Sequence, residues 1–299
     1  MSGGIFCAAT DWGTTSLRLW LLDREGGVVA ESRGDDGILT VEPEGYPAVL
    51  RRHLAAVSAP TGIPVIICGM AGARQGWLEA PYAATPADLS TICSQAAAAH
   101  FDGADVRILP GVAQYDPDRP DVMRGEETQL MGLGMAEGTV CIPGTHSKWA
   151  TMESGRLTGF TTFMTGELFA VLGKHTILRH SVSDADFDAG SPAFEAGVRR
   201  ALDEDNALSA LLFGVRARGL TADDPGDGGA YLSGLLIGSE LSAAVRRSGR
   251  AGEVTLLASG ALADLYESAM ILAGLTVRRH DADAAARAGL YGAAREIWG

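Results

Sequence analysis

The sequence predicts an α/β protein built from two similar halves. Strand and helix patterns alternate along most of the chain, and each half opens with an apolar strand, a turn rich in hydroxyl side chains and a second strand. The 299 residues are also long for a single hydrophobic core and sufficient for two. We therefore expect an enzyme-sized protein of two domains, with a boundary near residue 137.

The first half is expected to open with a three-stranded meander and to continue with alternating helices and strands. Strands are predicted over 4–10, 15–22 and 27–33, with glycine-containing turns between them. The later elements are a helix over 46–57, the buried strand IPVIICGM, an Ala- and Ser-rich helix over 87–100, the strand VRILPG and a helix in GEETQLMGLGM. Glu126 and Glu127 fall in the first turn of that last helix, where the helix dipole favours carboxylates.

The second half repeats the pattern after Gly138. The stretch TVCIPGTHSKWATMESGRLTGFTTF is typical of three strands separated by tight turns, and EVTLLASGALADLYESAMILAG predicts a strand, a Ser-Gly turn and a helix. Within YLSGLLIGSEL, Gly234 and Gly238 indicate close packing of one helix on another. Further helices are expected over 166–174, 192–203, 229–247 and 283–297. The shared opening hairpin favours a duplicated architecture.

Composition and charge argue against several classes of protein. The 24 Lys and Arg residues against 37 Asp and Glu give a formal net charge of −13 without any basic run, so nucleic acid is not an expected partner. The N-terminus lacks a signal-peptide pattern and no apolar run reaches the roughly 18 residues of a membrane helix, so no membrane association is expected. The cysteines lack metal-binding spacing, which predicts a reduced, cytoplasmic protein.

The first hairpin turn, Asp11-Trp12-Gly13-Thr14-Thr15, combines the groups that a phosphate tail requires. A tight turn presents backbone N–H groups, the threonines add hydroxyl donors, and a carboxylate can hold Mg²⁺ or its waters. The alternative interpretation is an ordinary hairpin turn whose polar side chains bond only locally. The common phosphate-binding motifs, GxxxxGK[ST] and a GxGxxG between strand and helix, are absent.

Two further turns offer related chemistry. In IPGTHSKWA, Gly144 and Thr145 form a strand-to-strand turn that could hold a triphosphate from the side opposite to the first turn. The Ser259-Gly260 turn between a strand and a helix allows the close backbone approach that a base or ribose uses. Ordinary polar roles in a hairpin are the alternative for the residues that follow Thr145, among them Lys148 as a solvated side chain.

Seven motifs carry a resemblance to a known family. They are DWGTTSLR, GMAG, MRGEETQ, PGTHSKW, MTGEL, SGLLIGSEL and LLASGALADLY. Together they look like the 2-dehydro-3-deoxygalactonokinase family, within the superfamily of actin, sugar kinases and heat-shock chaperones. The resemblance runs from about residue 5 to near the C-terminus, and MRGEETQ with PGTHSKW is its most specific part.

The resemblance implies two ribonuclease H-like domains with a nucleotide cleft between them. The N-terminal domain would span 1–137 and the C-terminal domain 138–283, with a helix at about 284–299 packing back on the first. The implied reaction is ATP-dependent, Mg²⁺-assisted phosphorylation of the 6-hydroxyl of 2-dehydro-3-deoxy-D-galactonate, in galactonate catabolism. Asp11 then serves the metal. The implied nucleotide contacts are Gly13, Thr14, Thr15, Gly144, Thr145, His146, Ser147, Lys148, Ser259 and Gly260.

The catalytic base is expected in the acidic pair of MRGEETQ. Many sugar kinases place an Asp ahead of the second phosphate loop, where this chain has RGEETQ instead. Glu126 and Glu127 resemble the acidic pair of phosphate-hydrolysing relatives, and Glu127 is the favoured base with Glu126 as the alternate. Both could instead serve only the helix dipole.

The substrate carboxylate calls for a local cation, because the net charge of the chain repels anions. Arginine is preferred over lysine for its bidentate geometry. Arg124, Arg74 and Arg18 lie in motif turns and are the candidates. Arg18 could instead form a salt bridge on the sheet surface, and Arg124 could simply neutralise the acidic pair beside it.

Two other functions fit parts of the pattern. The GEE helix start suggests a phosphohydrolase of the same superfamily that acts on polyphosphate or nucleotide tails. A non-catalytic nucleotide-binding module is the third hypothesis, and the lack of an appended peptide-binding domain argues against it. A homodimer is the default expectation for oligomeric state.

Overall fold

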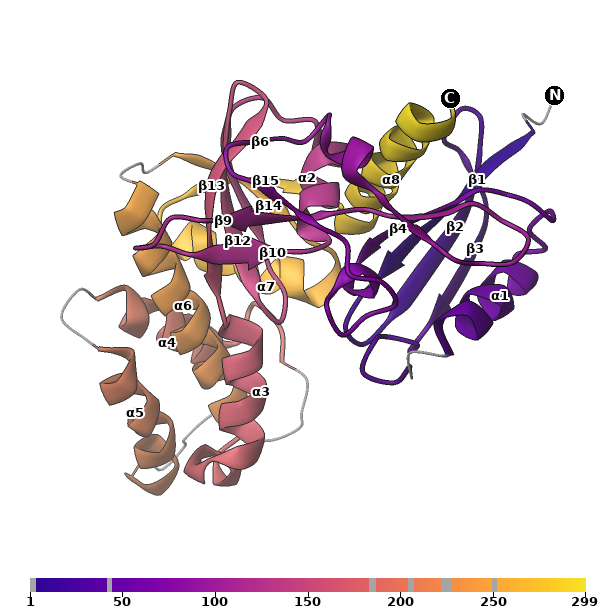
Figure 1. The fold of residues 1–299 in the computed structure, drawn as a ribbon. Helices are drawn as coiled ribbons and strands as arrows, with labels where there is room; N and C mark the ends of the chain where they lie inside the picture. Colours follow the sequence, from indigo (N-terminus) through magenta and orange to yellow (C-terminus); the bar gives the residue numbers. More distant parts are fainter. Residues whose placement is uncertain (1–3, 42–44, 183–186, 204–206, 222–226, 249–251) are drawn as a thin grey trace. The chain divides into compact units, whose positions relative to one another are not determined.

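The computed structural model describes residues 4–41, 45–182, 187–203, 207–221, 227–248 and 252–299 (Figure 1). By their contacts, these residues form two compact units. Unit 1 comprises Met1–Glu137, Met152–Phe160 and Ala282–Gly299, and unit 2 comprises Gly138–Thr151 and Thr161–Asp281. The C-terminal helix therefore belongs to the same unit as the N-terminal strands.

The main sheet of unit 1 confirms the predicted meander and its continuation. Its strands are β1 Ile5–Trp12, β2 Leu17–Asp23, β3 Val28–Gly34, β4 Val65–Gly69, β7 Ala97–Ala99 and β8 Val106–Ile108. Their order is β3-β2-β1-β4-β8-β7. β2 pairs antiparallel with β1 and β3, whereas β4 pairs parallel with β1 and β8. A meander followed by parallel strands thus forms one continuous sheet.

Helices cover both faces of this sheet, which explains why its inner strands are apolar on both sides. The helices of unit 1 are α1 Tyr46–Ala56, α2 Glu126–Leu133 and α8 Ala282–Trp298, with a short 3-10 turn η2 at Met70–Gly72. Because successive strand residues point to opposite faces, Ala8 of β1 packs in the cluster of Leu50 from α1. Its neighbour Ala9 packs in the cluster of Leu290 from α8.

Glycines bring α2 into close contact with α8. A Cβ atom at Gly132 of α2 would overlap the Ala285 carbonyl, and one at Gly289 of α8 would overlap the Thr128 carbonyl. The two backbones touch directly at these points, so any side chain there would push the helices apart. This packing fixes the N-terminus of α2, which carries the acidic pair.

The predicted helix over 87–100 is wrong. This stretch forms the two-residue strand β6 Ala87–Asp88, the 3-10 turn η3 Ile92–Gln95 and strand β7. The Asp88 carboxylate accepts hydrogen bonds from the Ser90 N–H and hydroxyl, a local turn that competes with helix formation. β7 then pairs antiparallel with β8. Tertiary pairing outweighs the helix propensity of the alanines.

A small second sheet of unit 1 was not predicted. Its strands β5 Tyr82–Ala84, β9 Gly111–Gln114 and β10 Asp121–Met123 have the order β10-β9-β5. Strands of three or four residues are too short to show a reliable alternation of polar and apolar side chains. β10 leads directly into the turn that starts α2, and so this sheet positions Arg124 and the acidic pair.

The other six-stranded sheet repeats the strand order of the first. Its strands are β11 Gly138–Ile142, β12 Ser147–Glu153, β13 Arg156–Phe163, β14 Glu253–Leu257 and β15 Thr276–His280, with β6 at the edge. The order is β15-β14-β11-β12-β13-β6. In both sheets the first strand pairs with the second on one side and with the fourth on the other. The duplicated architecture is confirmed.

The helices of unit 2 include one that the sequence did not reveal. They are α3 Thr165–His175, α4 Pro192–Leu202, α5 Leu208–Thr221, α6 Gly228–Ser248 and α7 Gly260–Leu272, with a 3-10 turn η4 at Ile177–His180. α5 and strand β15 were not predicted. A Cβ at Gly234 of α6 would overlap the Phe194 carbonyl of α4, which confirms that this glycine serves close helix packing. None of the described helices has the length and apolar character needed to cross a bilayer.

Candidate active site

The predicted first phosphate turn is Asp11-Trp12-Gly13-Thr14-Thr15, between β1 and β2. Some of its backbone polar groups are already bonded within the protein. The Gly13 N–H donates to the Ser16 carbonyl at 2.8 Å, and the backbone N–H groups of 38–39 donate to the carbonyls of Gly13 and Thr14. Thr14 and Thr15 are exposed. The two threonines are therefore available to a phosphate, whereas the Gly13 N–H closes the turn, and the predicted nucleotide contact of Gly13 stays a prediction.

The Asp11 carboxylate lies in an acidic environment at the end of β1. Its side chain is 19% exposed, and the Cys68 thiol donates to Oδ1 at 3.7 Å. Burial raises the pKa of Asp11. Arg18, with Nη1 at 3.8 Å from Oδ2, lowers this pKa, while the charges of Asp283 and Glu126 raise it further. The charges of Asp283 and Glu126 thus favour a cation near Asp11, and Arg18 supplies one.

Arg18 bridges the carboxylate of Asp11 and that of Asp283, which lies in the first turn of α8. Arg18 and Arg33 lie opposite each other on β2 and β3, and Asp283 accepts one hydrogen bond from each guanidinium, at 2.8 and 2.9 Å. Like charges opposite each other in a sheet repel, and Asp283 compensates both. Arg18 is thus held in an ion-pair network, and its predicted contact with the substrate carboxylate stays a prediction.

The acidic pair occupies two different environments at the start of α2. Glu127 is 1% exposed, and its carboxylate accepts from the Gly125 N–H at 2.7 Å and from the Thr128 hydroxyl at 3.0 Å. Glu126 is half-buried and accepts from the Arg124 backbone N–H at 3.1 Å. Gly125 permits this turn because its φ is +110°. Glu127 faces the interior, whereas Glu126 retains partial access to solvent.

Glu127 should make the stability of the protein depend on pH. Burial, followed by the charge of Glu126, raises the pKa of Glu127 from its ordinary value of 4.5 to about 8. The folded protein then binds this proton more tightly than the unfolded chain, so the unfolding free energy falls as pH rises from 4.5 to about 8. The slope from one such group is at most about 1.4 kcal/mol per pH unit.

Urea unfolding of wild type and Glu127→Gln at pH 5, 6, 7 and 8 tests this expectation. The Gln variant lacks the proton equilibrium, so its unfolding free energy should vary less with pH and should gain on wild type as pH rises. Curves that stay parallel across the range would contradict the assigned environment of Glu127.

Arg124 and Arg74 differ strongly in burial. Arg124 is 9% exposed, its Nη2 donates to the Ala80 carbonyl at 2.8 Å, and its guanidinium stacks on Tyr82 at 4.2 Å. Its Nε and Nη1 are buried without a hydrogen-bond partner among the described residues, and Nη1 lies against Gly72. Arg74, two residues along the same Gly-rich turn, is exposed.

The second phosphate turn is held against the start of α3. A Cβ at Gly166 would lie 2.6 Å from the Gly144 carbonyl, and the Glu167 N–H donates to the Thr145 carbonyl at 3.0 Å. Thr145 and His146 are exposed, and the His146 ring lies 2.6 Å from the Glu167 carboxylate. The motif MTGEL thus supports the motif PGTHSKW, and Gly166 permits the contact.

Ser147 and Lys148 point into unit 2, which corrects two of the predicted nucleotide contacts. The Ser147 hydroxyl is buried and donates to Glu240 at 2.6 Å. Lys148 is 4% exposed, and its ammonium group donates to the His146 carbonyl at 3.0 Å. Its alternative interpretation as a solvated side chain is wrong as well. The exposed part of this turn is Thr145 and His146, and Gly144 beside them is half-buried.

The Ser259-Gly260 turn joins β14 to α7. Both residues are exposed, and Gly260 has a φ of +64°. The Ser259 hydroxyl donates to Asp281 at 2.9 Å. Within unit 2, a mostly apolar cavity of about 180 Å³ is bordered by Gly144 and by Leu262 of α7, so the second phosphate turn and the first turns of α7 share one pocket.

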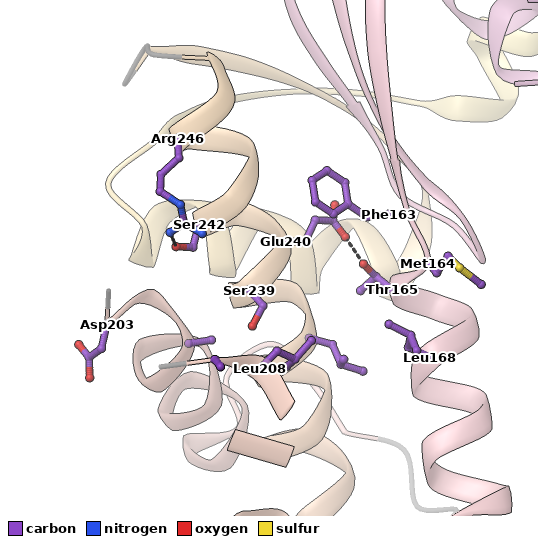
Figure 2. A pocket seen from close by; sticks show the side chains of 13 residues that line it. Phe163, Met164, Thr165, Leu168, Asp203, Leu208, Ser239, Glu240, Ser242 and Arg246 are labelled. Carbon is purple, nitrogen blue, oxygen red and sulfur yellow. Dashed lines mark hydrogen bonds between the residues drawn. The ribbon is translucent and has the colours of Figure 1, made fainter. Parts of the chain in front are cut away.

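A larger cavity of about 350 Å³ lies beside α6 (Figure 2). Figure 2 shows Glu240 of α6 joined by a hydrogen bond to Thr165 of α3, with Ser239, Ser242 and Arg246 further along α6. Thr165 borders both cavities. The start of α3 therefore separates the larger cavity from the one beside the phosphate turn.

Comparison with known proteins identifies the family. A sequence profile described as 2-keto-3-deoxy-galactonokinase matches residues 11–293. A protein of Rhizobium meliloti (strain 1021), described as a probable 2-dehydro-3-deoxygalactonokinase, is 51% identical over 98% of both chains. The 2-dehydro-3-deoxygalactonokinase of Escherichia coli (strain K12) is 34% identical over 97% of both. The chain belongs to the 2-keto-3-deoxy-galactonokinase family.

Solved structures agree with this family and with the fold. A crystal structure of a candidate 2-dehydro-3-deoxygalactonokinase from Sinorhizobium meliloti superposes with a TM-score of 0.93 at 50% identity, covering 98% of this chain and 97% of that one. The ADPNP-bound activator of 2-hydroxyisocaproyl-CoA dehydratase from Clostridium difficile gives 0.55 at 13% identity, covering 98% and 95%. The second match supports the fold alone, that of two ribonuclease H-like domains.

The sequence analysis of this family member missed Glu240. The residue lies in the apolar helical run SGLLIGSEL and is 2% exposed. Burial raises the pKa of Glu240, and its hydrogen bonds oppose that shift. A single ionisable residue within this apolar run was the available signal, because a buried carboxylate requires polar partners.

Proposed function

We propose that this chain transfers the γ-phosphoryl group of ATP to the 6-hydroxyl of 2-dehydro-3-deoxy-D-galactonate, a step of galactonate catabolism. The full-length match to the 2-keto-3-deoxy-galactonokinase family carries this proposal. Kinase members of ATP-binding superfamilies rely on positioning and charge neutralisation more than on covalent chemistry. The role of each residue is therefore proposed from the ligand groups that its exposed atoms can bind.

In this proposal the nucleotide is bound by exposed residues of unit 2. The Gly144-Thr145-His146 turn offers backbone and side-chain donors to phosphate oxygens. The exposed Gly260 allows close approach of the adenosine, and the apolar cavity bordered by Gly144 and Leu262 suits an aromatic base. Considered by itself, unit 1 offers the exposed hydroxyls of Thr14 and Thr15 as donors to phosphate oxygens.

Asp11 fits the role of a Mg²⁺ ligand. Asp283 and Glu126 create the negative potential that a cation favours, and Asp283 shares Arg18 with Asp11. Among the described residues, no three His, Cys, Asp or Glu side chains form a metal cage. Mg²⁺ usually keeps several waters and takes one or two carboxylates together with substrate phosphates, so one carboxylate is sufficient. When bound, the metal neutralises charge on the transferring phosphoryl group.

We assign the catalytic base to Glu126 rather than to Glu127. Both oxygens of Glu127 accept hydrogen bonds from α2 and its cap, and the side chain is 1% exposed. A base must come within roughly 3 Å of the hydroxyl that it deprotonates. Glu126 is half-buried and lies close enough to Asp11 to raise its pKa. Glu127 then positions the start of α2.

We propose that Arg74 binds the substrate carboxylate. The buried Arg124 adds positive charge beneath the same turn. Arg74 is exposed and makes no ion pair among the described residues. Arg124 lies under the same Gly-rich turn, against Gly72, with two donor nitrogens unpaired. A buried, incompletely compensated guanidinium gives this region a positive potential that favours an anionic substrate.

A coupled assay for ADP tests the proposed reaction. The wild-type protein is given Mg-ATP with 2-dehydro-3-deoxy-D-galactonate, its C4 epimer, a neutral hexose or no acceptor. We expect the highest kcat/KM with the first acid and negligible ADP without acceptor. Equal ADP release without any acceptor would instead support the phosphohydrolase, and preference for the neutral hexose would refute the substrate assignment.

Replacing Arg74 by Met should raise KM for the sugar acid about 10²-fold, the effect of losing one or two charge-assisted hydrogen bonds. Stability should stay unchanged because the side chain is exposed. Arg107→Met, which removes a half-buried arginine of the same unit paired with Asp105, is the control. An unchanged KM in Arg74→Met would move the carboxylate contact elsewhere.

A further inference from the structure

We propose that Glu240 is a positioning residue that holds the second phosphate turn, α3 and α7 in the arrangement that binds ATP. This inference rests on the proposed kinase function. Glu240 itself is buried and contacts no nucleotide in the proposal, so its effect would pass through the residues that it holds. The proposal rests on the hydrogen-bond partners of Glu240 and on the segments to which these partners belong.

One carboxylate connects three other elements of unit 2. Glu240 of α6 accepts through Oε1 from the Ser147 hydroxyl at 2.6 Å and from the Trp149 indole N–H at 2.8 Å, both on β12. Through Oε2 it accepts from the Thr165 hydroxyl of α3 and from the Tyr266 hydroxyl of α7, the latter at 2.8 Å. Both oxygens are fully used, and β12, α3 and α7 share a single acceptor.

Each partner lies next to a proposed nucleotide contact. Ser147 directly follows the exposed turn that ends at His146. Thr165 precedes Gly166, whose close approach to the Gly144 carbonyl fixes the other side of that turn. Tyr266 lies on α7, which begins at the Ser259-Gly260 turn. The carboxylate therefore sets the position of the phosphate turn relative to the adenosine turn.

Cavities lie on both sides of this hydrogen-bond network, so packing alone constrains the neighbouring helices weakly. Glu240 and Thr165 border the cavity of about 350 Å³ that Figure 2 shows, and Thr165 with Tyr266 borders the cavity of about 180 Å³ beside Gly144. Where side chains do not fill the space, packing constrains helix position weakly. Four directional hydrogen bonds to one charged group supply the missing constraint.

The experiment compares Glu240→Gln with Glu240→Ala. In the Gln variant the amide oxygen can keep Ser147 and Trp149, and the hydroxyls of Thr165 and Tyr266 can rotate to accept from the amide nitrogen. The Ala variant leaves all four donors without this acceptor. Calorimetry measures the Kd of ADP and, separately, of the sugar acid, and urea unfolding measures stability.

Val198→Ala is the control for a purely structural effect, because Val198 is fully buried on α4 in the same core and touches no proposed contact. We expect Glu240→Ala to weaken ADP binding about 10-fold or more, Glu240→Gln by less than about 3-fold, and Val198→Ala not at all. Sugar-acid affinity should be unchanged in all three.

The possible outcomes distinguish the positioning role of Glu240 from the proposed kinase function. ADP binding by wild type with equal ADP affinity in Glu240→Ala would overturn the positioning role and leave the kinase proposal intact. If Glu240→Ala does not fold, Tyr266→Phe, which removes one of the four donors, should weaken ADP binding, and an unchanged ADP affinity in that variant would overturn the positioning role equally. A wild type that does not bind ADP would refute the proposed function and this inference together.

Discussion

Replacing Asp11 by Asn should lower kcat with Mg-ATP by about 10³-fold or more, because a metal ligand contributes several kcal/mol to stabilising transition-state charge. The same substitution should leave the free energy of unfolding unchanged or higher. Burial and the charges of Asp283 and Glu126 raise the pKa of Asp11, so its ionised form is disfavoured in the folded protein. Asn keeps the shape and removes this repulsion.

The combination of lost rate and retained stability distinguishes a metal ligand from a structural carboxylate. Steady-state rates over a range of Mg²⁺ concentrations and urea unfolding would be measured for Asp11→Asn. Asp105→Asn, which removes an exposed carboxylate of unit 1 that is paired with Arg107, is the control and should keep its rate. A folded Asp11→Asn variant with near wild-type kcat would refute the metal role.

Replacing Glu126 by Gln should lower kcat by about 10²- to 10⁴-fold, the range expected for loss of a general base. Glu127→Gln should have a much smaller effect on kcat, because the Gln amide oxygen can still accept from the Gly125 N–H, and the Thr128 hydroxyl can rotate to accept from the amide nitrogen. KM for ATP should change little in either variant, since the proposed nucleotide contacts lie elsewhere.

The pair of variants decides between the two carboxylates. Rapid-quench measurement of the first turnover isolates phosphoryl transfer from product release. A large loss in Glu127→Gln with full activity in Glu126→Gln would reverse the assignment. Full activity in both variants would remove the acidic pair from catalysis and leave the kinase reaction without a base in this turn.

Local pattern was sufficient for most of the fold. The meander of unit 1 and the strand that ends at Gly69 follow from short apolar runs bounded by glycine turns. The helix predicted over 87–100 does not form. Its alanines favour a helix only where no other backbone hydrogen bonding competes with it. Here the Asp88 turn and the pairing of β7 with β8 compete successfully.

The sequence predicted which turns form the candidate site. It did not predict the direction in which each side chain points. Thr14, Thr145 and Gly260 are exposed, as ligand contacts require. Ser147 and Lys148 lie one and two residues beyond the exposed His146, yet both are buried at the start of β12. Sequence spacing places residues in a motif, but burial depends on which elements pack over the strand.

The sequence by itself determined the family, the α/β class, the duplication and the positions of the motif turns, because these depend on local pattern and contiguous motifs. Tertiary structure alone decided how the charged groups pair. Asp283 lies 265 residues from Arg18, and Glu240 lies 93 residues from Ser147. Ion pairs and hydrogen bonds act over a few ångströms in space, so partners this distant along the chain meet only when the chain is folded.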